Sequence, residues 1–158
     1  MEKMLKRISQ VGVLVRDLDR AMKAFADDFG ITQWHQFDAT KDFGQLLVDG
    51  KPGMLNIRGA ITAELEGMEI ELIEPVGEGA FADHLAKYGP GVHHFAVIMP
   101  DRNAGFRQVM DRELAAGRLP WIRAEMAEGE PGKKMDFAYI DRREDMGVIM
   151  ELYNEDKE

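Results

Sequence analysis

Four polar residues occupy matching places in the two halves of this sequence. The segment ISQVGVLV near the N-terminus recurs in altered form as VHHFAVIM, and an offset of 84 residues places Gln10 on His94. A second pair of similar segments, IELIE and MELYN, places Glu71 on Glu151 at an offset of 80 residues. Self-similarity at a fixed period indicates a repeated structural unit. Each half therefore offers one polar residue on its first expected strand and one glutamate on its last.

Together these four side chains offer three oxygen ligands and one imidazole nitrogen. Such a set suits a divalent cation such as Zn²⁺, Co²⁺, Ni²⁺ or Mn²⁺, with coordination positions left for water or substrate. A single glutamate on a half-buried strand is more often solvated, and a histidine beside an apolar run is more often structural. The equivalent placement of both pairs favours a metal site of Gln10, Glu71, His94 and Glu151. The residue pattern by itself leaves both interpretations open.

The alternation of side chains along the expected strands determines which residues can share a site. Glu71 points to the face opposite its apolar neighbours, and the same holds for Glu151. Because the helices need an apolar sheet face to pack on, both glutamates are expected on the opposite, concave face. There Gln10 and His94 can point into the same space. By the same alternation, His93 should point away from His94 and have a packing or supporting role.

Each half reads as a strand, a helix and three further strands, so the fold class is expected to be α+β. Strands are expected at 7–15, within 31–43, and at 45–48, 54–58, 62–66, 68–74, 92–99, 119–123, 137–140 and 148–153; helices are expected at 20–29, 80–87 and 103–116. The division is an N-terminal module over 1–76, a connecting helix and turn over 77–91, and a C-terminal module over 92–158. At 158 residues, the two modules are expected to form one structural domain.

Composition excludes several classes of partner and site. The net charge of -9, from 20 basic and 29 acidic residues, argues against nucleic acid or an anionic membrane as a partner. The absence of cysteine excludes disulfides, thiolate metal sites and a cysteine nucleophile. The N-terminal residues lack the apolar core of a signal peptide, and no apolar run is long enough to span a bilayer. A cytoplasmic protein is therefore expected.

The sequence resembles the vicinal oxygen chelate superfamily, which includes glyoxalases, bleomycin resistance proteins and extradiol dioxygenases. The segments that carry the resemblance are, in chain order, QVGVLVRDLDRAM, EIELIEP, GPGVHHFAV and GVIMELY. They are most similar to the methylmalonyl-CoA epimerase and glyoxalase I branches. The resemblance implies two paired βαβββ modules that form a curved mixed sheet around a metal cleft, with Gln10, Glu71, His94 and Glu151 as ligands. Epimerases usually have histidine at the first position, whereas glutamine there is similar to the eukaryotic type of glyoxalase I.

These residue types suit proton transfer next to a carbonyl group. A cation polarises the carbonyl oxygen and stabilises the enediolate that forms when the adjacent carbon loses a proton, and a carboxylate takes that proton. The resemblance implies that Glu151, Glu71 or both act as this base. We therefore expect a metal-dependent isomerase or lyase, glyoxalase I-like or methylmalonyl-CoA epimerase-like, acting on an acyl-CoA or a hemithioacetal.

The alternative is a metal-free protein of the same fold that sequesters a small molecule. Iron-dependent oxygenation is disfavoured because the ligand set holds one histidine.

The substrate pocket is expected to involve aromatic residues and loops. The aromatic candidates are Trp34, Phe43, Trp121 and Tyr139, although aromatic residues in strands more often belong to the core. Loops 31–53 and 124–136 are expected to set specificity. Because related folds often dimerise, a homodimer is expected.

Overall fold

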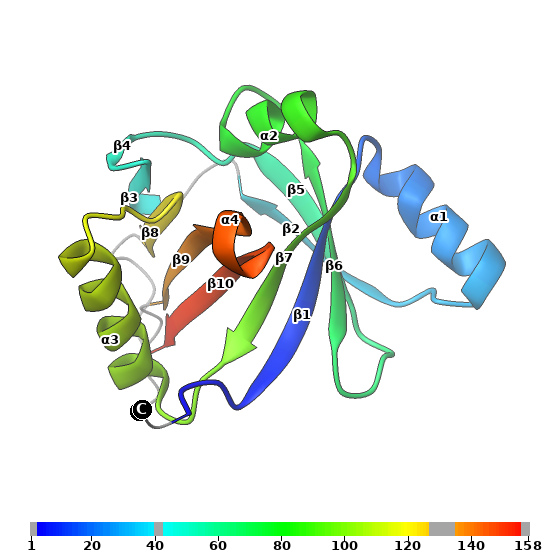
Figure 1. Cartoon of the computed structure of the whole chain (residues 1–158). Coiled ribbons are helices and arrows are strands. Elements are labelled where there is room, and N and C mark those ends of the chain that lie inside the picture. Colours follow the sequence, from blue (N-terminus) through cyan, green and yellow to red (C-terminus); the bar gives the residue numbers. More distant parts are fainter. Residues whose placement is uncertain (1–2, 40–42, 127–134, 156–158) are drawn as a thin grey trace. The chain divides into compact units, whose positions relative to one another are not determined.

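The computed structural model describes residues 3–39, 43–126 and 135–155. These residues contain four helices and ten strands (Figure 1). The chain forms two compact units made from interleaved segments. The N-terminal unit comprises Ser9–Lys41 and Met54–His94, and the C-terminal unit comprises Met1–Ile8, Asp42–Gly53 and Phe95–Glu158.

The N-terminal unit is a mixed sheet with two helices. Its elements are β1 (Arg7–Leu14), α1 (Leu18–Phe29), β2 (Trp34–Ala39), β5 (Ile57–Thr62), β6 (Glu69–Pro75), α2 (Ala80–Tyr88) and the first half of β7 (Gly91–Ile98). The strand order is β2-β5-β6-β1-β7. Strands β1 and β6 run parallel, whereas β5 is antiparallel to both β2 and β6.

Helix α1 ends at Phe29 as predicted but begins at Leu18, two residues before the expected start. The Asp17 carboxylate accepts a hydrogen bond from the backbone N–H of Arg20, which satisfies one of the free donors at the helix start. Gly30 ends the helix with a left-handed φ of 70°, a conformation that glycine adopts without a Cβ clash. The buried Leu18 of this helix packs with Leu72 of β6, and the helix thereby covers the apolar face of the sheet.

The C-terminal unit contains the remaining strands and helices. Its elements are β3 (Phe43–Val48), β4 (Lys51–Pro52), the second half of β7, α3 (Arg102–Ala115), β8 (Ile122–Met126), β9 (Met135–Arg142), α4 (Arg143–Met146) and β10 (Val148–Glu155). The strand order is β7-β10-β9-β8-β3-β4. Phe106 and Met110 of α3 pack with Ile140 and Leu152 of the sheet, so α3 covers one face of this unit. The predicted class, α+β with a mixed sheet, is confirmed.

Several local predictions differ from the structure. No strand covers 63–66, where one was expected, because β5 ends at Thr62 and the chain bends there before β6 begins at Glu69. The strand expected at 54–58 begins only at Ile57, because Asn56 adopts a positive φ of 46° that interrupts an extended backbone. Residues 42–53 belong to the C-terminal unit, since β3 pairs antiparallel with β8 and places Val48 opposite Ile122. The two units are thus a different division from the modules at 1–76 and 92–158, which stay a prediction.

A buried carboxylate on α3 binds two arginines of the C-terminal unit, one just after this helix and one at the end of β9. Glu113 is 4% exposed, and its carboxylate accepts hydrogen bonds from Nε and Nη2 of Arg118, at 2.7 and 2.9 Å, and from Nη1 of Arg142 at 2.9 Å. The hydrogen bond from Arg118 is the main cause that lowers the pKa of Glu113 below its ordinary value of 4.5. A carboxylate with a lowered pKa stabilises the folded state at neutral pH, and this contribution is lost as the pH falls below 4.5 through the folded-state pKa.

Replacing Glu113 with glutamine should therefore destabilise the protein in a pH-dependent way. We expect a loss of about 2 kcal/mol at pH 7, because three hydrogen bonds from arginine lose the negative charge of their acceptor, and a much smaller loss in acid. Urea unfolding at neutral and acidic pH measures both values. Asp111→Asn, at an exposed position on the same helix, is the control and should change little. An equal loss at both pH values would contradict the assignment.

Candidate metal and proton-transfer site

The sheet of the N-terminal unit has one helix-covered face and one face that carries the predicted polar residues. Ile70 and Leu72 pack with residues of α1, so Glu71 between them points to the opposite face, as predicted. The parallel pairing of β1 with β6 sets Gln10 beside Glu69 and Gly12 beside Glu71. The polar face is therefore built on β6, β1 and β7, which lie next to one another in the strand order (Figure 1).

The imidazole of His94 lies directly over Gly12. A Cβ atom added to Gly12 would be 1.9 Å from Cε1 and 2.2 Å from Nδ1 of His94, which is far inside van der Waals contact. Because Gly12 has no side chain, the ring can cross β1 and reach β6. His94 Nε2 lies 3.2 Å from Glu71 Oε2, and the two side chains are 0% and 9% exposed. The glycine on the central strand thus brings together ligands from the strands on its two sides.

The geometry of this pair fits a divalent cation. Two ligand atoms about 2.1 Å from one ion, at tetrahedral or octahedral angles, are roughly 3.0–3.4 Å from each other. The observed separation of 3.2 Å between His94 Nε2 and Glu71 Oε2 falls within this range. Despite this short distance, neither atom makes a hydrogen bond within the described part of the chain, as expected for two atoms that face one cation. Nε2, rather than Nδ1, is the nitrogen of His94 that faces Glu71.

Gln10 belongs to the same face and is held by a residue that the sequence argument did not identify. Its side chain is 8% exposed, and Nε2 of its amide donates a 2.9 Å hydrogen bond to Glu69 Oε2. This bond fixes which end of the amide is the donor and makes Oε1 the atom suited to a cation. Glu69 shares a strand face with Glu71 two residues later, and this alternation was the signal that could have identified it.

His93 does not point away from His94 as the alternation predicted. The two Nδ1 atoms are 3.1 Å apart, within hydrogen-bonding distance. Alternation constrains the direction of each Cβ but not the side-chain rotations, and these rotations bring the two rings together. The predicted packing role is present as well, because the buried ring of His93 contacts Phe81 of α2 at a centroid distance of 5.0 Å.

The C-terminal unit holds the fourth predicted ligand in an equivalent environment. Glu151 is 4% exposed on β10, and its neighbour Leu152 belongs to the core under α3, so Glu151 points to the other face. Its antiparallel partner on β9 is Tyr139, whose ring packs edge-to-face against Trp121 at a centroid distance of 6.0 Å. Within this unit the structure therefore places Tyr139 on the strand position beside Glu151, and Trp121 against Tyr139.

The other two predicted pocket residues have different surroundings. Trp34 packs edge-to-face on Phe25 of α1, with ring centroids 5.6 Å apart, so it lies on the helix-covered face rather than beside Glu71. Phe43 begins β3, and its backbone is the partner of Met126 on β8. The specificity loop expected at 124–136 lies partly outside the described residues.

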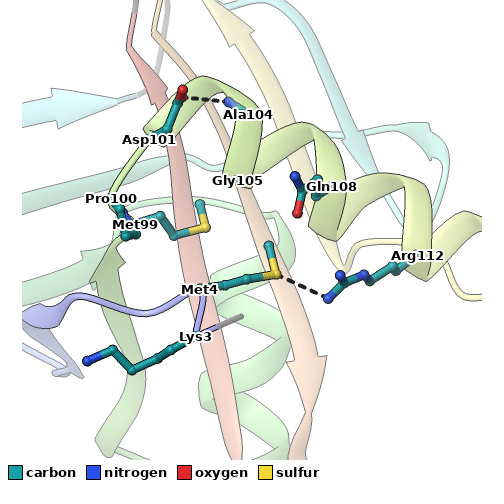
Figure 2. A pocket seen from close by; sticks show the side chains of 9 residues that line it. All are labelled: Lys3, Met4, Met99, Pro100, Asp101, Ala104, Gly105, Gln108 and Arg112. Carbon is teal, nitrogen blue, oxygen red and sulfur yellow. Dashed lines mark hydrogen bonds between the residues drawn. The ribbon is translucent and has the colours of Figure 1, made fainter. Parts of the chain in front are cut away.

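A hollow of about 270 Å³ occurs elsewhere in the C-terminal unit and contains none of the predicted site residues. Figure 2 shows it between the segment with Lys3 and Met4 and the first turns of α3. Asp101 uses its carboxylate to cap α3 at Ala104, and Arg112 donates to the Met4 sulfur. The first contact stabilises the start of the helix and the second joins the N-terminal segment to it, so both have a structural role.

Comparison with known proteins identifies the family. The family model of the glyoxalase/bleomycin resistance protein/dioxygenase superfamily matches residues 9–139, so this chain belongs to that superfamily. The match includes Gln10, Glu71 and His94 and ends within β9, before the strand that carries Glu151. No curated protein matches the sequence.

Solved structures with the same fold include epimerases. Methylmalonyl-CoA epimerase from Mycobacterium tuberculosis is 24% identical with a TM-score of 0.60, over 97% of this chain and 90% of that chain. A variant of the Streptomyces coelicolor epimerase in complex with 2-nitronate-propionyl-CoA is 24% identical with a TM-score of 0.59, over 94% of each chain. A hypothetical protein from Bacillus halodurans is 16% identical with a TM-score of 0.59, over 96% of each chain. In the described part of the chain, no helix combines the length and apolar character that a membrane crossing requires.

Substitution of Gly12 by alanine tests the arrangement of the pair. The added methyl group must displace the His94 ring, and we expect about 1–3 kcal/mol of destabilisation, the usual cost of overpacking a core. Urea unfolding measures the loss, and the His94 ring proton resonances in NMR report the displacement. Gly77→Ala is the matched control, because its nearest atom would be 3.5 Å away. Similar small effects from both variants would refute the role of Gly12.

Proposed function

We propose that this chain is a divalent-metal-dependent isomerase or lyase that moves a proton next to the carbonyl group of its substrate. The observation that carries the proposal is the buried contact of 3.2 Å between His94 Nε2 and Glu71 Oε2. An imidazole and a carboxylate at this separation form half of a typical site for a divalent cation. Membership of the superfamily supports the proposal, and so does the fold shared with methylmalonyl-CoA epimerases.

Four residues would hold the cation in this proposal. His94 and Glu71 supply the observed pair, and Gln10 supplies its amide oxygen from the same sheet face. Glu151 is included because it is the counterpart of Glu71: it is buried, lies on the last strand of its half, and points away from the helix-covered face. When bound, a divalent cation supplies positive charge that polarises a carbonyl oxygen and stabilises the negative charge developing there.

The carboxylates would move the proton. One of Glu71 and Glu151 takes a proton from the carbon next to the carbonyl, and the electron pair of the broken C–H bond passes to the carbonyl oxygen. Return of a proton to the same carbon from the opposite side inverts that centre, as an epimerase requires. Return to the adjoining carbon gives the reaction of glyoxalase I. Burial favours both reactions, because exclusion of water strengthens the interaction of the carboxylates with the reacting groups.

A CoA thioester is the substrate class we place first. The epimerases with this fold include one in complex with methylmalonyl-CoA, a thioester with an acidic C–H next to its carbonyl group. A hemithioacetal is the second candidate, because the first ligand position is Gln10, the residue found there in the eukaryotic type of glyoxalase I. Both substrate classes have an acidic C–H next to an oxygen that a cation can bind.

The metal requirement is tested by metal analysis of the purified full chain. We expect a stoichiometric divalent metal in the wild type and a reduction in affinity of more than about tenfold in Glu71→Ala and His94→Ala, which remove the ligand atoms. Inductively coupled plasma mass spectrometry and a Co²⁺ titration measure content and affinity. Glu66→Gln, at an exposed position in the turn before β6, is the control and should retain metal. A wild type that binds no divalent ion would disprove the metal-dependent mechanism.

The proton-transfer step is tested with Glu151→Gln. An amide keeps an oxygen that can bind a cation but cannot take a proton, so we expect metal retention with a loss of about 10²–10⁴-fold in exchange. Deuterium incorporation from solvent into methylmalonyl-CoA and into the methylglyoxal–glutathione hemithioacetal, followed by NMR, measures the rate. Glu144→Gln, exposed on α4, is the control. Unchanged exchange in Glu151→Gln would exclude Glu151 as the base, and tight substrate binding without metal or exchange would support sequestration instead.

A further inference from the structure

His93 is the buried residue whose contacts the proposed reaction does not use. Its side chain lies between the site and α2, and the residue is 5% exposed. Its ring centroid is 5.0 Å from that of Phe81 and 4.4 Å from that of His84, both on α2. The His84 ring meets it nearly edge-on, at an interplanar angle of 72°. These contacts hold the His93 ring against α2.

The other side of the His93 ring meets His94 through a single pair of nitrogens. The Nδ1 atoms of the two rings are 3.1 Å apart, and one of them must carry the hydrogen. If His94 gives the lone pair of Nε2 to a cation, its own hydrogen is on Nδ1 and His93 accepts it. His93 then carries its hydrogen on Nε2. The pairing therefore determines which nitrogen of His94 is available to face Glu71.

We infer that His93 is a positioning residue that fixes the orientation and tautomer of His94 through the Nδ1–Nδ1 hydrogen bond. As an account of metal binding the inference rests on the proposed function, whereas the hydrogen bond itself does not. Metal-binding histidines usually donate their second N–H to a carboxylate, a backbone carbonyl or water. Here the acceptor is a neutral imidazole, which adds no further negative charge next to the buried Glu71 carboxylate.

The arrangement gives α2 a role at the site. The rings of Phe81 and His84 pack against His93. The Nδ1 atom of His93 lies within hydrogen-bonding distance of that of His94, and the His94 ring extends over Gly12 to contact Glu71. Each contact in this series joins residues of the N-terminal unit. The helix that follows β6 thus fixes the angle at which the His94 ring crosses β1, although it carries none of the proposed ligands.

Two substitutions of His93 separate hydrogen bonding from packing. His93→Phe keeps an aromatic ring against Phe81 but removes both nitrogens. His93→Asn loses the ring but keeps a polar atom on Cγ, where Nδ1 is attached, so it can restore the bond to His94. His84→Phe is the matched control, because it changes the same aromatic cluster without changing the pair. The sequence has four histidines, few enough for individual NMR assignment.

The first measurement uses ¹⁵N NMR of the metal-free full-length protein. We expect a coupling across the hydrogen bond between the two Nδ1 nuclei and one dominant tautomer of His94 in the wild type and in His84→Phe. We expect His93→Phe to lose the coupling and to show mixed tautomers or a mobile ring. An absent coupling in the wild type, with His94 signals that do not change in His93→Phe, would overturn the inference whether or not the protein binds metal.

The second measurement is affinity for Co²⁺, followed by its visible absorption spectrum. We expect His93→Phe to bind about 10–100-fold more weakly with a shifted spectrum, and His93→Asn to recover part of the loss. Equal affinities and spectra in the wild type and His93→Phe would refute the positioning role while leaving the proposed function intact. A wild type that binds no Co²⁺ but shows the coupling would refute the proposed function and preserve the histidine pair.

Discussion

The contact between His94 and Glu71 is possible because Gly12 has no Cβ atom. In a sheet, residues on alternate strands are separated by about 10 Å, so their side chains rarely meet when the strand between them carries a side chain of its own. Gly12 leaves the space above β1 open, and the His94 ring fills it to within 1.9 Å of where a Cβ would be. Because of this glycine, the imidazole can be buried and can reach the carboxylate on the polar face of the sheet.

The candidate ligands could be identified from sequence because they follow a repeat, whereas the residues that hold them do not. Gln10 and His94 occupy matching positions, and so do Glu71 and Glu151. The repeat matches Gly12 with Ala96, a position at which no ring corresponds to that of His94. Comparison of the two halves therefore could not show that Gly12 makes room for the His94 ring. The bond between Gln10 and Glu69 and the pairing of the two histidines depend on side-chain rotation, which periodicity does not encode.

The fold shows a similar contrast between local and non-local information. Alternation and capping residues predicted β1, α1 and β6 well, because these signals lie within the element itself. The placement of β3 depends on pairing with β8, more than 70 residues later, and nothing in either segment specifies the partner. The late start of β5 depends on the positive φ of Asn56, which is uncommon for a residue other than glycine.

The interleaved order of the two units has a consequence for biosynthesis. Strand β3 is made before α2 and β7, but its partner β8 leaves the ribosome only after α3 is complete. Until then, the edge of β3 lacks that partner, and unpaired edges promote association between chains. The N-terminal unit can pair β1 with β6 as soon as β6 emerges. Nascent chains are therefore most exposed to aggregation in the interval between these two pairing events, and chaperone protection would be needed mainly there.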